Sequence, residues 1–338
     1  MKALQITDTH QLDVIQLPAP QPAADEVLLR IGYVGFCGSD LNTYRGRNAL
    51  ALKPVVPGHE ISAVIEAIGP DVPAGLHVGQ QVTVDPYTAC GRCPSCRRRR
   101  PNACQHNQTL GVQRHGAMRE LLCVPWQKVI PAEGLAPQDV ALIEPMSVGF
   151  HAVDRGQVTD ADTVLVIGCG MIGVGAIVRA SLRGATVIAM DLDDEKLALA
   201  RQLGAAATIN SGREDVHARL MQLTDEAGPD VVIEAVGAAV TYATAVNEVA
   251  FTGRIVCIGY APTDVTLATR FFVQKELDIR GSRNALPDDF RAVIRYLQRG
   301  QCPTQQLISA IVQPEEASQA MADWDAAPGK VFRILVKF

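Results

Sequence analysis

A predicted strand that runs into a glycine-rich turn and a helix constrains the fold of this 338-residue chain most strongly. The apolar run Thr163–Ile167 leads directly into Gly168-Cys169-Gly170-Met171-Ile172-Gly173, the context in which G-x-G-x-x-G binds a dinucleotide. Gly168 allows the tight turn, Gly170 lets the pyrophosphate approach the backbone, and Gly173 permits close packing of helix and strand. The cofactor contacts expected from this turn are Gly168, Gly170, Ile172 and Gly173.

An acid ends the next predicted strand, about twenty residues later. Asp191 would accept hydrogen bonds from the adenosine ribose hydroxyls and would repel a 2′-phosphate, which favours NAD over NADP. The Leu192-Asp193-Asp194-Glu195 segment that follows adds negative charge and no arginine. The structural alternative for Asp191 is a helix N-cap. Because the strand, the glycines and the acid agree, the sequence predicts an NAD site.

The wider pattern predicts an α/β protein of two domains, which the length of the chain also favours. In the first 150 residues, short β-rich runs are separated by glycine and proline, which indicates a compact β-barrel-like domain. From Thr163 onward, apolar strands alternate with helical stretches. That alternation is the signature of a doubly wound parallel sheet.

Four clustered cysteines form the most specific motif, Cys90-x2-Cys93-x2-Cys96-x7-Cys104. Four thiolates within fifteen residues can wrap one tetrahedral Zn²⁺ in a closed structural site. The N-terminus shows no signal-peptide core, and in such a chain metal binding is favoured over disulfides. The alternatives are unrelated thiols and a four-thiolate iron–sulfur cluster, although the spacing differs from the common ferredoxin runs.

Charge and hydropathy argue against two kinds of partner. The net charge of −5 disfavours nucleic acid, and the cysteines lack the layout of DNA-reading fingers. We interpret Arg97-Arg98-Arg99-Arg100, inside the cysteine lobe, as a solvated surface, with a subunit contact as its alternative use. No apolar run is long enough to span a membrane. A cytoplasmic protein is expected.

A second metal site is predicted from Cys37, His59 and Glu60. A thiolate, an imidazole and a carboxylate suit a catalytic Zn²⁺ with one position open for substrate, although a lone cysteine is usually a small buried side chain. Cys37 and His59 are the firm pair. Glu60 is adjacent to His59, so both can ligate only where the chain bends, which Gly58 permits. Glu144 would ligate directly or through water, in competition with Glu60.

Together these residues resemble the zinc-containing medium-chain dehydrogenases over essentially the whole length. The likeness rests on Cys37-Gly38-Ser39-Asp40, Gly58-His59-Glu60, the four-cysteine lobe, Glu144-Pro145 and the glycine fingerprint with Asp191. Glu144-Pro145-Met146-Ser147-Val148, with Glu60, is similar to the sorbitol (polyol) dehydrogenase branch. Gly281-Ser282-Arg283-Asn284-Ala285, followed by Asp288-Asp289-Phe290, resembles sugar-acid members such as L-galactonate or L-gulonate 5-dehydrogenases.

The resemblance implies a domain order and further cofactor and subunit contacts. It implies a GroES-like catalytic domain at residues 1–151, with the structural zinc lobe at about 85–110, and a Rossmann domain at 152–284. Residues 285–338 would complete the catalytic domain. The resemblance also implies Lys196 as a ribose contact, and a homodimer or homotetramer.

The expected activity is zinc-dependent oxidation of a secondary alcohol of a sugar acid or polyol, with hydride transfer to NAD. An aldonate 5-dehydrogenase of the L-galactonate type is the first hypothesis. A polyol, butanediol or threonine dehydrogenase is the alternative within the family, and a non-catalytic sensor of NAD and zinc is the alternative from another class. One catalytic and one structural zinc ion are expected.

Proton release and substrate contact involve further residues. Ser39 can accept a hydrogen bond from the substrate hydroxyl. Family members often carry a histidine five residues after the cysteine ligand, but Asn42 stands there and cannot take up a proton, so we expect a relay through ordered water. Tyr44, Arg283 and Asn284 are candidates for contacting polar substituents of the substrate. The guanidinium of Arg283 suits a carboxylate, although contact with the cofactor or a neighbouring subunit is the alternative.

Overall fold

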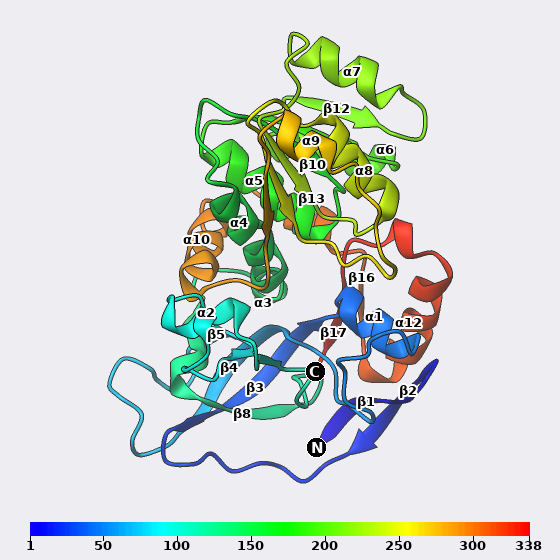
Figure 1. Ribbon diagram of the computed structural model, residues 1–338. Helices are drawn as coiled ribbons and strands as arrows, with labels where there is room; N and C mark the ends of the chain where they lie inside the picture. The colour runs from blue at the N-terminus through cyan, green and yellow to red at the C-terminus, as the bar shows by residue number, and fades with distance from the viewer. The chain divides into compact units, whose positions relative to one another are not determined.

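The chain leaves its first structural unit after Glu144 and returns to it at Leu286 (Figure 1). The computed structural model describes residues 1–338. The first unit comprises Met1–Glu144 and Leu286–Phe338, and the second comprises Pro145–Ala285. The change of unit falls in the first turn of α4 (Ile143–Gly156), earlier in the chain than the predicted division after residue 151.

A seven-stranded sheet forms the framework of the first unit, in the order β16-β17-β3-β4-β5-β9 with β8 paired to β3. Its strands are β3 (Glu26–Gly35), β4 (Glu60–Ile68), β5 (Gln81–Val84), β8 (Leu121–Pro125), β9 (Val129–Pro131), β16 (Ala310–Val312) and β17 (Ile334–Lys337). Two further antiparallel pairs are β1 (Lys2–Asp8) with β2 (Gln11–Gln16), and β6 (Tyr87–Thr88) with β7 (Gln108–Thr109).

The register of this sheet brings distant parts of the chain together at one end. Gly35, the last residue of β3, pairs with Glu60, the first residue of β4, and with Leu335 of β17. The residues just outside these strands therefore meet, although they come from three separate parts of the sequence. Cys37, His59 and Glu60 lie at this end.

Short helices connect the strands of the first unit, and the C-terminal segment shares its core. The helices are α1 (Gly38–Tyr44), α2 (Pro94–Arg97), η1 (Pro101–Ala103), η2 (Trp126–Lys128), α3 (Pro137–Val140), α10 (Pro287–Leu297), α11 (Thr304–Leu307), η3 (Pro314–Glu316), α12 (Ala317–Ala326) and η4 (Pro328–Lys330). Met321 and Trp324 of α12 are buried in the same apolar cluster as Leu4 of β1 and Ile31 of β3. Burial of this apolar surface ties the end of the chain to its beginning.

The second unit is built on a parallel six-stranded sheet in the order β12-β11-β10-β13-β14-β15. Its strands are β10 (Thr163–Ile167), β11 (Thr186–Asp191), β12 (Ala207–Asn210), β13 (Val231–Glu234), β14 (Arg254–Cys257) and β15 (Asp278–Gly281). In sequence order this is the 3-2-1-4-5-6 arrangement of the Rossmann fold. The order reverses between β10 and β13, where such sheets bind their ligands.

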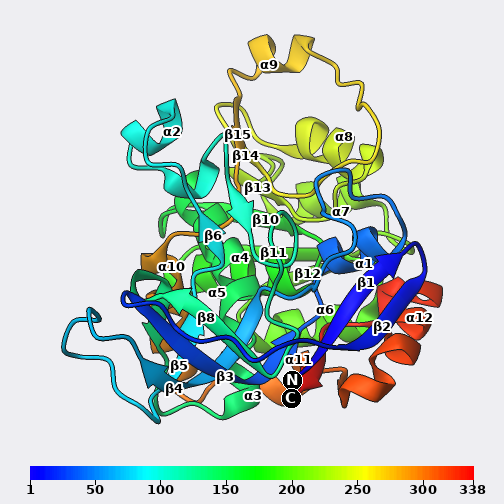
Figure 2. The ribbon, with the colours of Figure 1, turned by 90° about the horizontal axis from the view of Figure 1, so that it is seen from below.

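Helices cover both faces of this sheet (Figures 1 and 2). They are α4, α5 (Met171–Leu182), α6 (Asp194–Gln202), α7 (Val216–Leu223), α8 (Ala239–Glu248) and α9 (Arg270–Gln274). The core includes Leu165, Ile188, Val232 and Ile255, one residue from each of the four central strands. No helix in the chain combines the length and the apolar character needed to cross a membrane. The predicted α/β class with a doubly wound parallel sheet is confirmed.

Candidate active site

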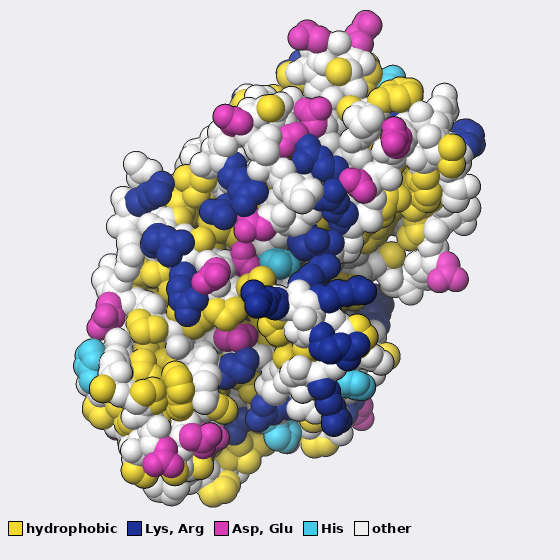
Figure 3. All heavy atoms as spheres, turned by 60° about the vertical axis from the view of Figure 1, so that its left-hand side comes forward, with side chains coloured by type: hydrophobic (Ala, Val, Ile, Leu, Met, Phe, Trp, Pro, Cys, Tyr) yellow, Lys and Arg dark blue, Asp and Glu magenta, His cyan; other side chains and the backbone are white.

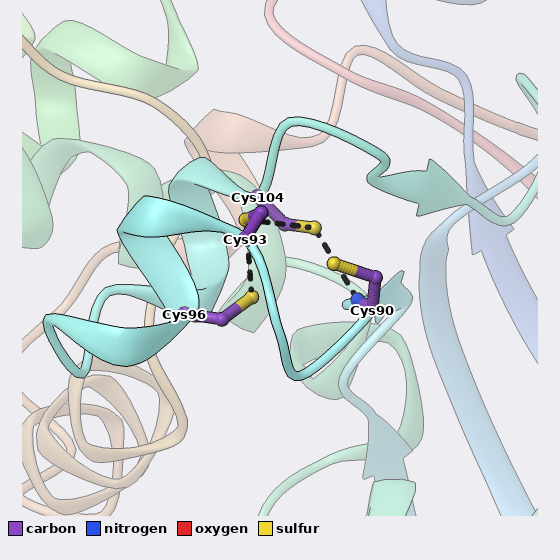
Figure 4. Close-up of side chains that lie close together, drawn as sticks. All are labelled: Cys90, Cys93, Cys96 and Cys104. Atoms are coloured by element: carbon purple, nitrogen blue, oxygen red, sulfur yellow. Dashed lines mark hydrogen bonds between the residues drawn. The ribbon is translucent and has the colours of Figure 1, made fainter.

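The four cysteines of the lobe meet in space (Figure 4). Their sulfur atoms all lie within 4.8 Å of one another, and Cys93 Sγ is 3.5 Å from Cys96 Sγ and 3.8 Å from Cys104 Sγ. Sulfurs bound to one zinc ion at a Zn–S distance of about 2.3 Å would lie about 3.8 Å apart. None of the four is in a disulfide. The lobe therefore has the geometry of a closed four-thiolate zinc site.

Hydrogen bonds favour the thiolate form of Cys93, whereas burial and the neighbouring thiols raise the pKa of Cys96 to about 11. The Ser95 hydroxyl, 3.0 Å from Cys93 Sγ, and the backbone N–H of Cys96 help to lower the pKa of Cys93 to about 5. Cys104 Sγ accepts a hydrogen bond from the backbone N–H of Cys90 at 3.3 Å. Because zinc binds thiolates, these donors suit the metal site.

The arginine run lies on the outer surface of the lobe. Arg97, Arg98 and Arg99 are exposed and Arg100 is half-buried. Arg97 Nη1 donates to the carbonyl of Arg92 at 2.7 Å, so its contact is with the lobe itself. Lys and Arg side chains gather on the face seen in Figure 3. These side chains do not enter the cluster of sulfurs.

Cys37, His59 and Glu60 also lie together, with ligand atoms within 4.8 Å of one another. Cys37 precedes α1, and His59 leads into β4, which Glu60 begins. Gly58 bends the chain here with a φ of +99°, and a Cβ at this position would lie 2.6 Å from Val34 Cγ1. His59 and Glu60, although neighbours in sequence, present their ligand atoms to the same point.

Glu60 is a fully buried carboxylate held by Arg333, which the sequence analysis missed. Gly35 makes room for the carboxylate, because a Cβ there would lie 2.1 Å from Glu60 Oε2. Arg333 Nε lies 3.0 Å from the same oxygen, and Arg333 Nη1 donates to the carbonyl of Phe36 at 2.5 Å. Burial raises the pKa of Glu60 and the Arg333 charge opposes that rise. Arg333 thus links the chain beside Cys37 to Glu60.

The site buries three carboxyl groups beside one arginine and one histidine, and burial raises the pKa of each carboxyl group. Glu60, Glu144 and Asp40 are all buried, and Arg333 is a single buried arginine beside them. Burial raises the pKa of Asp40, with the charge of His59 opposing this. His59 Nδ1 and Glu60 Oε1 are buried without a hydrogen-bond partner. Buried carboxylates and unpaired ring nitrogens of this kind are satisfied by a cation, so the cluster fits Zn²⁺.

Glu144 is hydrogen-bonded by Tyr87, another residue that the sequence analysis missed. The Tyr87 hydroxyl donates to Glu144 Oε1, and both side chains are buried. Burial and then the charge of Glu144 raise the pKa of Tyr87, with smaller effects from Asp85 and Cys37, so the phenol keeps its proton. Glu144 is not one of the three residues whose ligand atoms converge. Its competition with Glu60 for the metal stays a prediction.

Helix α1 carries the residues expected for proton transfer and substrate contact. Ser39 Oγ is buried without a hydrogen-bond partner, so it can accept a hydrogen bond from a substrate hydroxyl. Asn42 is exposed. Tyr44 is buried, and its ring meets His10 edge-on with centroids 5.1 Å apart. Tyr44 belongs to the core of the first unit, and its contact with substrate stays a prediction.

The glycine-rich turn joins β10 to α5 at the point where the strand order reverses. A Cβ at Gly173 would lie 1.8 Å from the carbonyl oxygen of Gly168, so this glycine lets the helix pack against the turn. At Gly170, the N-cap of α5, a Cβ would meet nothing within 4 Å, and no side chain caps the helix. Ile172 is half-buried in the first helical turn. An open helix N-terminus fits a pyrophosphate.

Asp191 lies against this turn at the end of β11. Its Oδ2 accepts from the N–H of Cys169 at 2.7 Å, and its Oδ1 accepts from Leu192 at 2.8 Å and Asp193 at 3.1 Å. The N-cap alternative is wrong, because Asp193 caps α6 by accepting from the N–H of Glu195. A carboxylate offers about four lone-pair positions, so Asp191 can still accept from a ribose hydroxyl.

The remaining expected contacts lie in the second unit. Lys196 is half-buried in α6. Burial and the charge of Asp191 raise the pKa of Cys169 in the glycine-rich turn, and the charge of Lys196 opposes this rise. Arg283 and Asn284 follow β15 and are half-buried, and Asn284 has a φ of +54°. Both make interactions within the structure. Their contact with substrate stays a prediction.

Glu234, at the end of β13, was also missed. Its Oε1 accepts from the N–H groups of Val236 at 3.0 Å and Gly237 at 2.8 Å, and from Thr241 Oγ1 at 2.8 Å. A Cβ at Gly168 would lie 2.6 Å from Val236 Cγ2, so this loop packs on the glycine-rich turn. Glu234 therefore holds the loop that packs against the glycine-rich turn. In the sequence it only ends an apolar strand.

Comparison with known proteins identifies the family. Residues 23–134 match the alcohol dehydrogenase GroES-like domain, and residues 172–299 match the zinc-binding dehydrogenase model. L-galactonate-5-dehydrogenase of Escherichia coli (strain K12) is 34% identical over 294 residues, which cover 87% of this chain and 86% of that protein. The chain belongs to the zinc-type alcohol dehydrogenase family. Its members are oxidoreductases.

Two further comparisons agree with this assignment. Sorbitol dehydrogenase of Bacillus subtilis (strain 168) is 32% identical over 332 residues, covering 95% of this dehydrogenase and 92% of that protein. The crystal structure of the alcohol dehydrogenase rspB from E. coli CFT073, complexed with NADH, has a TM-score of 0.90 and 30% identity, covering 100% of this chain and 99% of that chain. The predicted family, and the predicted GroES-like and Rossmann fold class, are confirmed.

Proposed function

We propose that this dehydrogenase oxidises a secondary alcohol of a sugar acid or polyol and transfers the hydride to NAD. An aldonate such as L-galactonate, oxidised at C5, is the first candidate substrate. The cluster of Cys37, His59 and Glu60 carries the proposal, because its ligand atoms converge apart from the four-cysteine lobe. A protein that used zinc only for structure would have no need of this second cluster, which argues against a non-catalytic sensor.

The residues of the first unit divide the chemistry among them. Bound zinc supplies a Lewis acid that makes a hydroxyl more acidic. Cys37, His59 and Glu60 would hold the ion, with Glu144 in competition for a coordination position. The alcohol becomes a ketone by losing a hydride to NAD⁺ and a proton to solvent. Ser39 Oγ accepts a hydrogen bond from the substrate hydroxyl, which loses its proton. Ordered water then carries the proton to solvent, because the amide of Asn42 is not a base.

The second unit supports NAD rather than NADP as the hydride acceptor. The uncapped N-terminus of α5 suits the pyrophosphate, and the carboxylate of Asp191 repels a 2′-phosphate. Glu195 and Asp194 are exposed beside it and add negative charge. The relative crystallised with NADH supports the same choice.

The names of the relatives support a hydroxylated substrate. One is an L-galactonate dehydrogenase and another a sorbitol dehydrogenase, so a sugar acid and a neutral polyol are the two candidate classes. Arg283 favours the sugar acid, because its guanidinium can bind a carboxylate through two hydrogen bonds. We also propose that the protein works as a homodimer or homotetramer, which light scattering would test.

The test of this function is NADH formation across aldonates and neutral polyols. Each active substrate is rerun with NADP and after removal of zinc by a chelator. We expect aldonate oxidation that requires zinc and prefers NAD, and we expect Arg283→Gln to raise KM for the aldonate while leaving KM for a polyol unchanged. Activity confined to polyols would favour the sorbitol-type alternative. An absence of turnover with zinc bound at Cys37 would overturn the enzymatic proposal.

A further inference from the structure

We propose that Tyr87 is a positioning residue that orients Glu144 at the catalytic metal and makes that site depend on the four-cysteine lobe. The inference rests on the zinc site proposed above. Neither residue of this pair belongs to the lobe's sulfur cluster, and neither is among the three converging ligands.

The contact itself is a buried hydrogen bond between side chains. Glu144 is 4% exposed and Tyr87 is 5% exposed, and the phenol O–H donates to Glu144 Oε1. A donor that holds one oxygen sets the plane of the carboxylate and so determines how the other oxygen is presented to a metal. Hydrogen bonds of this outer kind commonly control metal affinity.

Tyr87 is fixed on several sides, as a positioning donor should be. Its N–H donates to Asp85 Oδ1 at 3.0 Å, and Lys128 Nζ donates both to the carbonyl of Tyr87 and to Asp85 Oδ2. The Tyr87 ring meets the fully buried ring of Phe290 edge-on, with centroids 6.4 Å apart and an interplanar angle of 73°. The phenol therefore has one well-defined position. That position is set within the first unit.

Tyr87 also lies in the strand pair that opens and closes the four-cysteine lobe. Tyr87 pairs with Thr109 in the β6–β7 ladder, and these two strands lead into and out of the lobe. Cys90 follows Tyr87 after three residues, and Cys104 precedes Thr109 by five. A metal that joins Cys90 to Cys104 closes the same loop as the ladder. Loss of that metal would loosen the ladder and with it the donor to Glu144.

Metal binding by Tyr87→Phe tests the inference, because phenylalanine keeps the ring and loses only the donor. Zinc content is measured during dialysis against increasing chelator, and Co²⁺ is then loaded and followed by its visible absorption spectrum. We expect one of the two metal ions to bind about 10–100-fold more weakly, a changed cobalt spectrum, and retention of the lobe metal. The matched control is Tyr33→Phe on β3, half-buried, which should keep wild-type values.

Glu144→Gln shows whether Tyr87 acts through Glu144. If it does, adding Tyr87→Phe to Glu144→Gln changes metal affinity little further, whereas a general structural role would give additive losses. Wild-type affinity and cobalt spectrum in Tyr87→Phe, or full additivity in the double variant, would overturn the inference and leave the proposed function standing. A wild-type protein that binds metal in the lobe alone would overturn both.

Discussion

The two metal sites of this dehydrogenase are built in opposite ways. The lobe takes all its ligands from one segment, Cys90 to Cys104, which a single zinc ion can close. The second cluster takes Cys37 and His59 from the ends of neighbouring strands, while Arg333 reaches it from near the C-terminus. The first site is local in sequence, and the second exists only after the sheet has formed.

Because of this difference, we expect the lobe to contribute mainly to stability and the second cluster mainly to the reaction. A metal that closes one loop contributes its binding free energy to the order of that loop. The second cluster depends on strand register, since Gly35 must face Glu60 before Arg333 can reach the carboxylate. Substitutions in the lobe should therefore act first on structure, and substitutions in the second cluster should act first on turnover.

The sharpest test of the difference is Cys37→Ala. Loss of the thiolate should remove one of the two zinc ions and lower kcat/KM by about 10³-fold, because the Lewis acid is lost. Thermal unfolding of the first unit, followed by the fluorescence of Trp126 and Trp324, should stay cooperative, because Cys37 lies outside the four-cysteine lobe. A variant with both zinc ions and normal turnover would contradict the assignment of Cys37 as a ligand.

The opposite pattern is expected for Cys104→Ser. Cys104 is fully buried, and the lobe cannot hold a tetrahedral zinc ion without it. We expect loss of the lobe zinc, faster tryptic cleavage at the exposed Arg97–Arg99 run, and a fall in turnover of about tenfold through the loosened Tyr87. Cys123→Ser, a half-buried cysteine outside the lobe, is the control. Unchanged trypsin sensitivity in Cys104→Ser would show that the metal does not order the loop.

Arg333→Met tests how the dispersed site balances its buried charge. Without the arginine, Glu60 is left as a buried carboxylate without its ion pair, which typically costs 3–5 kcal/mol. We expect a smaller loss of unfolding free energy, about 2 kcal/mol in the zinc-free protein, because Glu60 can take up a proton. Tryptophan fluorescence during urea unfolding measures it, with and without zinc.

The double variant Arg333→Met with Glu60→Gln is the control for this charge argument. Removing both charges should restore most of the lost stability, since a neutral amide needs no countercharge. Bound zinc should also reduce the effect of Arg333→Met, because the ion supplies positive charge to Glu60. An equal loss in the single and double variants would assign Arg333 a packing role instead.

The contrast between local and dispersed sites also explains how far the sequence predicts this protein. The lobe and the glycine-rich turn are contiguous motifs, so the spacing of their residues is enough to predict them. The strand predicted at Thr163–Ile167 is observed without change as β10. Contiguous apolar periodicity carries this information.

What the sequence could not show are contacts made by register and topology. Arg333 reaches Glu60 because β17 pairs with β3. Tyr87 donates a hydrogen bond to Glu144, which lies 57 residues later in the sequence. Glu234 looks like the end of an apolar strand until the loop after β13 is seen against Gly168. The sequence leaves a helix cap open for Asp191, but the structure shows that Asp193 caps α6. Two acids that lie two residues apart cannot be told apart as caps before the backbone is known.

The smallest expected effect concerns the anchor of α1, the helix that carries Ser39. A hydrogen bond from Arg45 Nε, at the end of α1, is the main cause of the lowered pKa of Asp325, and His10 and Arg47 add to it. A carboxyl pKa lowered by folding stabilises the protein above the unfolded value of about 3.9, and the stabilisation is lost as pH falls through the lower folded value. Asp325→Asn should therefore lower Tm between pH 5 and pH 7 by a roughly constant amount, and the difference should vanish well below about pH 3.9.

Calorimetry measures this difference in Tm, with the exposed Asp323→Asn on the same helix as the control. A difference that persists at low pH would mean that Asp325 holds α1 by its shape and not by its charge, and the dispersed site would then rest on packing at this end as well.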